Sequence, residues 1–398
     1  MPSHLTTAIL ASTALLALTA PAFALDGQDL LAKINAAYAS GSGDLQADNV
    51  TVEGNDVVLN GARFVATQSA DKAIDLGDLR FSDVEEGPGG SYDIGRVDFS
   101  NVALTEGNTS LAIKTFYLSG IHVPASQDGS DLNSLLYYRE AHLGSLTVNN
   151  DGKQIASIES GDAKVDVSSD NKTLSFTVAV DGIAATLDAV KDAKWTDMVD
   201  SLGIRQLDGR MTMAGSWNAE TGALDITDDT LDFDKVGRLQ IKLGLSGYTM
   251  DLVHQIQQNA EMMRTAPEGE ESKKAAAMAM LGLMQRLNFV GAEIRFDDHG
   301  ITKRALDYTG KQQGADGEQM ASTIKMMAPV LLMGYGLNDI ADSVSAALNT
   351  YLDDPKSFTI RAAPPQPVPF PTITAAGMSA PQTLTKVLSV TVNANDGP

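Results

Sequence analysis

The 398-residue chain carries 51 acidic against 29 basic residues, for a formal net charge of −22, and contains no cysteine. The charge argues against nucleic acid as a partner, because phosphate backbones repel an acidic chain and no basic run exceeds two residues. The missing cysteine excludes a disulfide framework, a thiol nucleophile, a cysteine-ligated zinc site and a lipid-modified cysteine.

The N-terminus is typical of a cleavable secretory signal peptide, residues 1–24. The apolar stretch from Ala8 to Ala20 is followed by Pro21 and then by Ala22-Phe23-Ala24, the small-x-small pattern that signal peptidase reads. We therefore expect cleavage after Ala24 and a periplasmic location. No Lys or Arg precedes the apolar stretch, so a buried N-terminal helix remains the alternative interpretation.

An N-terminal helix and linker are expected at 25–48, followed by a repeated-strand antiparallel region at 49–249. Asp75–Val84 aligns without gaps on Asp93–Val102, and Ile113–Ile121 follows the same pattern. Each copy alternates apolar and polar residues, as half-buried strands do. Repetition of such strands predicts a long meandering sheet with one continuous apolar face.

The later segments differ in composition. One helix is expected near 188–202, then a methionine-rich helical region at 250–353 with a short strand block at 292–307, and then a proline-rich strap with a C-terminal strand at 354–398. The predicted fold class is α+β: an elongated, curled, mostly antiparallel β-sheet of repeated strands, with methionine-rich helices covering its apolar face.

Motifs for catalysis and cofactor binding are missing: the sequence has no Gly-x-Ser-x-Gly, Gly-x-Gly-x-x-Gly or His-Glu-x-x-His. His122 and His142 could meet across neighbouring strands, but ordinary strand histidines are the simpler interpretation. The acidic residues between Asp225 and Asp234 lack the spacing of a calcium loop. We expect no catalytic residue, no metal and no cofactor.

Ten of the fifteen methionines lie between residues 250 and 335, and residues 326–337 contain no charge. Such a segment is too short to cross a bilayer, but it can lie on one or form the wall of an apolar groove. Plain core helices are the alternative. The residues expected to line an apolar groove are Met280, Leu283, Met284, Met326, Met327, Leu331, Leu332 and Met333.

The turn from Trp217 to Gly222, the strand Val236-Gly237-Arg238-Leu239 and the run from Leu352 to Arg361 carry a family resemblance. Together with the strand repeats, they resemble uncharacterised exported proteins of alphaproteobacteria and, more distantly, the AsmA/TamB-like and YdgA-type envelope proteins. The resemblance implies a sheet that forms an elongated, apolar-lined groove. No functional residue of this chain is inferred from the resemblance.

The leading functional hypothesis is a non-enzymatic periplasmic protein that binds lipid or another apolar envelope component between sheet and helices. A structural or partner-binding envelope protein, docking through a sheet edge or through Pro364–Pro371, is the alternative. An enzyme would need carboxylates or hydroxyls gathered from distant strands. With the expected signal removed, we expect any membrane contact to be peripheral.

Overall fold

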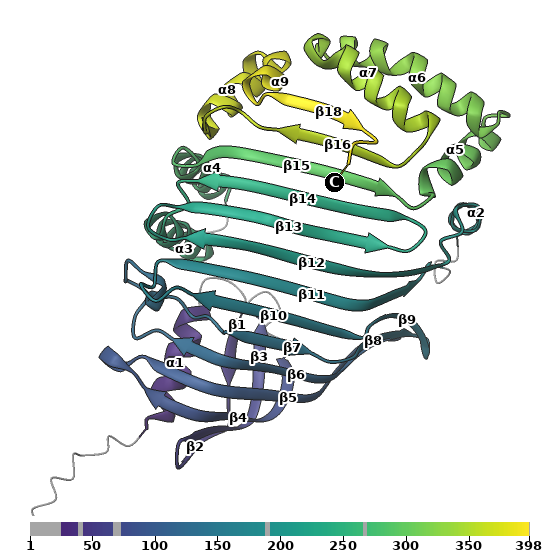
Figure 1. Ribbon diagram of the computed structural model, residues 1–398. Coiled ribbons are helices and arrows are strands. Elements are labelled where there is room, and N and C mark those ends of the chain that lie inside the picture. Colours follow the sequence, from purple (N-terminus) through teal and green to yellow (C-terminus); the bar gives the residue numbers. More distant parts are fainter. Residues whose placement is uncertain (1–24, 39–42, 67–72, 188–191, 266–268, 398) are drawn as a thin grey trace, which may run out of the picture.

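The computed structural model describes residues 25–397 except 39–42, 67–72, 188–191 and 266–268 (Figure 1). The expected signal peptide, residues 1–24, therefore lies outside the described residues. The described residues include the expected sheet and the helices that follow it.

Within the described residues, the strands form one antiparallel sheet of 18 strands that runs the length of the molecule (Figure 1). Its first half comprises β1 (Gly43–Gln46), β2 (Asn49–Glu53), β3 (Asp56–Ala66), β4 (Ala73–Glu86), β5 (Tyr92–Glu106), β6 (Thr109–Val123), β7 (Glu140–Leu143), β8 (Leu146–Asn150) and β9 (Lys153–Ile158). Its second half comprises β10 (Ser160–Val167), β11 (Thr173–Thr186), β12 (Gln206–Asn218), β13 (Ala223–Phe233), β14 (Gly237–Ser246), β15 (Asn288–Asp298), β16 (Ser357–Ala362), β17 (Val368–Pro369) and β18 (Val390–Ala394).

Neighbours in the sequence are mostly neighbours in the sheet, so the chain meanders from β2 to β18 (Figure 1). In two places, two strands pair with different parts of one longer strand: β7 and β8 both pair with β6, and β9 and β10 both pair with β11. The α+β class and the curled antiparallel sheet are confirmed.

The helices lie at the ends of the strands and at the ends of the sheet (Figure 1). They are α1 (Gly27–Tyr38), α2 (Ala193–Leu202), α3 (Met250–Thr265), α4 (Glu270–Met284), α5 (Ile301–Gln312), α6 (Gly317–Gly334), α7 (Asn338–Asp353), α8 (Phe370–Ser379) and α9 (Leu384–Val387). Helix α1 packs on β1, β2 and β6, and α7 packs on β16 and β18, whereas α3 packs on α4, and α6 packs on α5 and α7.

One strand boundary differs from the sequence-based expectation. The strand block at 292–307 ends at Asp298, because Gly300 adopts a φ of 98° and α5 begins at Ile301. The Asp298 carboxylate accepts hydrogen bonds from the amides of Gly300 and Thr302, at 2.7 and 2.9 Å, and so caps the new helix. Helix α6 includes Pro329 and ends at Gly334. Gly336 follows with a φ of 75°.

The proline-rich segment is only partly an extended strap. Val368 lies opposite Phe289 in the sheet, and the amide of Phe370 donates to the carbonyl of Leu287 at 3.0 Å. From Phe370 the chain turns into α8, since a proline in the first helical turn costs no hydrogen bond. At the other end, β1 begins at Gly43, inside the stretch expected to be a linker.

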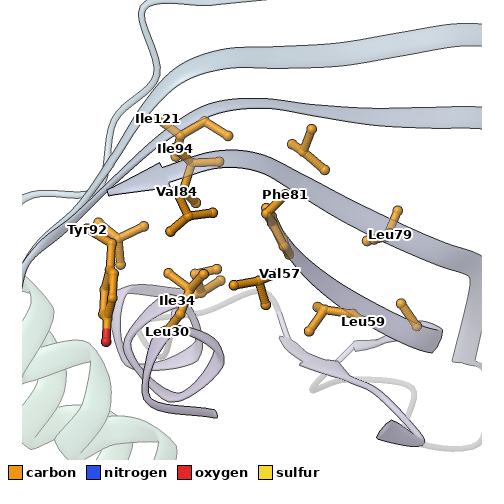
Figure 2. Packing of buried hydrophobic residues seen from close by; sticks show 13 residues of the cluster. Leu30, Ile34, Val57, Leu59, Leu79, Phe81, Val84, Tyr92, Ile94 and Ile121 are labelled. Carbon is orange, nitrogen blue, oxygen red and sulfur yellow. The ribbon is translucent and has the colours of Figure 1, made fainter. Parts of the chain in front are cut away.

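The main core lies under α1. Leu30 and Ile34 point from this helix onto β3, β4 and β5, where they meet Val57, Phe81 and Ile94 (Figure 2). Polar contacts fix the helix in place: Lys33 Nζ donates to the Gly90 carbonyl at 2.7 Å, and the Tyr92 hydroxyl donates to the Asp29 carboxylate at 2.7 Å. The helix is thus bound to the sheet on its apolar and on its polar side.

Leu30→Ala is expected to reduce the free energy of unfolding by about 2–5 kcal/mol, because it leaves a cavity where a side chain is 1% exposed. Chemical denaturation followed by circular dichroism measures the change. The matched control is Val52→Ala on β2, where the side chain is 43% exposed. Equal effects of the two substitutions would contradict the docking of α1 described above.

Candidate functional site

An apolar cavity of about 410 Å³ lies between α1 and the first strands of the sheet, and we call it the cup. Strands β4, β5 and β6 supply most of its wall, and α1, β1, β3 and the segment before β7 supply the rest. The lining residues are Ile34, Asn35, Gly43, Leu45, Phe64, Ile74, Leu76, Leu79, Phe81, Ile94, Val97, Phe99, Val102, Leu104, Ile113, Phe116, Leu118, Ile121, Leu136 and Tyr138.

The internal repeat of the sequence builds this wall. Leu76, Leu79 and Phe81 of β4 all face the cup. Simple alternation would turn Leu79 away from Leu76, but the register shifts around Gly77, whose φ is 68°, and the extra residue returns both side chains to one face. The aligned residues of β5 face the cup in the same way, namely Ile94, Val97 and Phe99.

Only two of the residues lining the cup, Asn35 and Tyr138, carry a polar side-chain atom, and none is charged. The Asn35 amide binds β1: its Oδ1 accepts from the Leu45 amide and its Nδ2 donates to the Leu45 carbonyl, both at 2.8 Å. A cup with such a wall offers dispersion contacts and dehydration, and it offers a ligand very little acid or base chemistry.

From the cup, an uninterrupted row of apolar residues and one glycine crosses the same face of the sheet, and we call it the strip. Each member lies directly opposite the next in the strand register. The row runs through Phe116, Leu143, Gly161, Val180, Met211, Leu231, Leu239, Phe296, Phe358 and Ala394.

The middle of this face is open. Leu231 is 36% exposed, and Ile294 and Ile360, in the row beside the strip, are 46% and 42% exposed. At its far end Phe358 meets the ring of Tyr351 from α7, with centroids 5.5 Å apart. The apolar face is therefore covered by α1 at one end and by α7 at the other, with exposed apolar side chains between them.

The opposite face of the same strands is polar, and its charged groups bind one another. Glu293 of β15 lies between Lys242 of β14 and Arg361 of β16, accepting hydrogen bonds at 3.1 and 2.6 Å. Burial would raise the pKa of Glu293, but the bonds from Arg361 and Lys242 outweigh it and lower that pKa below its usual value. Asp232 accepts from Arg210 and Arg238 in the same manner.

The eight residues expected to line an apolar groove lie on two separate helices. Met280, Leu283 and Met284 lie on α4, which precedes β15, and the other five lie on α6, which follows β15 and α5. None of the eight is among the residues lining the cup. Met280, Met326, Met327, Leu331 and Met333 are exposed, with Met326 71% exposed. The repeated apolar residues between 74 and 121 were the sequence signal that marked the cavity.

His122, His142 and Asp228 have structural partners. His142 lies opposite Tyr117, whereas His122 is held by the Asp93 carboxylate at 2.9 Å and the Asn133 carbonyl at 3.1 Å, so the two histidines do not meet. Asp228 accepts from Thr212, Thr230 and Gln240. In the described part of the chain, no group of three or more potential ligands could hold a metal ion.

No helix among the described residues is both long and apolar enough to cross a membrane. Residues 230–395 match the model of a protein family described as "Uncharacterized protein". This similarity covers the C-terminal part of the strip and the helices from α3 onward, and it lies outside the cup. No curated protein matches the chain.

Glu293→Gln is expected to reduce the free energy of unfolding by about 1–2 kcal/mol at pH 7, since Arg361 and Lys242 lose a carboxylate partner. A carboxyl whose pKa is lowered by folding stabilises the protein above its unfolded pKa, and this stabilisation is lost as pH falls through the folded pKa. The difference in the free energy of unfolding between variant and wild type, measured by urea denaturation, should be smaller at pH 3 than at pH 7. Glu85→Gln, at an exposed residue of β4, is the control. A difference that persists at pH 3 would contradict this account.

Proposed function

We propose that this protein is a non-enzymatic binding protein of the periplasm that takes up lipid, or another apolar component of the cell envelope, by its acyl chain. The single observation that carries the proposal is the cup, an apolar cavity of about 410 Å³ with no charged side chain among its lining residues. Its volume falls within the range of about 300–1,000 Å³ that is typical of small-molecule sites.

The strip supports the same proposal. Transfer of apolar surface out of water contributes about 25 cal/mol per Å². Leu231 in the strip, and Ile294 and Ile360 in the row beside it, are exposed. They therefore favour an extended apolar ligand, such as the part of an acyl chain that reaches beyond the cup. The polar face offers no comparable gain, because its charged groups already bind one another.

The alternative is a structural protein that binds a protein partner. Apolar side chains exposed on a sheet face also fit a partner surface. The two functions differ in what the purified protein carries. The binding function requires acyl-containing molecules in native mass spectra and in solvent extracts, whereas ligand-free protein with a full-strength partner complex would favour the structural function.

Ile113→Asp is expected to weaken binding of a fluorescent fatty acid by at least tenfold, because it places a carboxylate on the apolar wall of the cup. For the wild type, each additional methylene of the ligand chain should strengthen binding by about fourfold until the cavity is full. Fluorescence titration with a series of chain lengths measures both effects.

The matched control is Ala112→Asp. Ala112 is the preceding residue of β6, is exposed, and points to the opposite face of the sheet. Fatty acid affinity should be unchanged in this variant. Equal weakening by the two substitutions, or binding that does not depend on chain length, would refute the proposed site.

A further inference from the structure

The surface at the C-terminal edge of the sheet is unusual for so acidic a protein. Residues 326–337 and residues 362–385 contain no Asp, Glu, Lys or Arg, although the whole chain carries 51 acidic residues. The first segment is the second half of α6 and the turn after it, and the second contains β17, α8 and the start of α9.

The two uncharged segments lie side by side. A Cβ atom at Gly336 would stand 3.3 Å from Cβ of Gln382, so the end of α6 touches the turn between α8 and α9. Helix α6 packs on α7, and α7 packs on the edge strand β18. Figure 1 shows α6 and α7 beyond this edge of the sheet, and α8 and α9 near the strand ends beside it. We call the exposed part of the two segments the cap.

The cap presents its apolar side chains outward. Along α6 the exposed residues follow the helical period of one face, while Ile324, Ala328 and Leu332 between them are more buried. Tyr335 is 76% exposed at the end of the helix, and Met378 on α8 is 84% exposed. The exposed large apolar residues of the cap are Met326, Met327, Val330, Leu331, Met333, Tyr335 and Met378.

We propose that the cap docks the protein on the surface of an uncharged lipid bilayer. Methionine and leucine side chains on the outward arc of a helix suit a fluid apolar medium, and an aromatic ring at the helix end suits the interface with water. The binding is peripheral, because the uncharged stretch of α6 is too short to span the membrane.

The negative charge of the protein argues against a second copy of the chain, or an anionic membrane, as the partner of the cap. A second copy would bring two chains of net charge −22 together, and anionic headgroups would meet the same repulsion. An ordinary protein interface has an apolar centre that also contains polar groups forming hydrogen bonds with the partner, whereas the seven large residues exposed on the cap are apolar apart from the hydroxyl of Tyr335. A neutral lipid surface meets neither obstacle.

The test is flotation of the purified protein with phosphatidylcholine vesicles. The wild type should float with the vesicles, and M327E/L331E should lower the partition coefficient by about 100-fold, since two apolar side chains that enter the bilayer become charged. Adding phosphatidylglycerol should weaken binding of the wild type, and raising the salt concentration should restore it, because the acidic protein is then screened from the headgroups.

The control variant is M278E. Met278 is 65% exposed on α4, outside the two uncharged segments, and its substitution should leave flotation unchanged. All three proteins should bind the fluorescent fatty acid equally, which separates this proposal from the function of the cup. Docking is refuted if the wild type does not float, if M278E has the same effect, or if M327E/L331E only dissociates a dimer.

Discussion

The physical constraint on which this structure depends is the continuous apolar face of a single long sheet. Alternating strands place every second side chain on that face, and register carries the row from Phe116 in the cup to Phe358 near the far edge. A sheet must cover such a face with another layer. Here α1 and α7 cover the two ends, and the side chains of Leu231, Ile294 and Ile360 remain exposed between them.

The polar face compensates for the missing layer. On β13, β15 and β16 several residues that point away from the strip are buried: Asp232 and Glu293 are 8% and 9% exposed, and Thr359 is 3% exposed. Long arginine and lysine stems lie over these groups and bind them across neighbouring strands. Cross-strand ion pairs thereby fix the register in the region where the opposite face contributes least to stability.

The two ends of the sheet differ in where their helices place apolar side chains. At the N-terminal end α1 and β1 fold over the apolar face, and Asn35 joins them, so the face forms the wall of a partly open cup. At the C-terminal end the helices carry apolar side chains on their outer surface instead. We infer a molecule that holds an apolar ligand at one end, lies on lipid at the other, and exposes apolar side chains between them.

The sequence by itself determined the strand alternation, the equivalence of Leu79 and Val97 in the repeat, and a helix that ends near residue 202, because these depend on neighbours within a few residues. It did not determine the location of the cavity. A methionine stripe has the same helical period whether it faces a core or solvent, so the choice between α1 and α6 as the cover of the groove depended on tertiary packing. The same holds for residues 301–307, where one glycine and one capping carboxylate replace a strand with a helix.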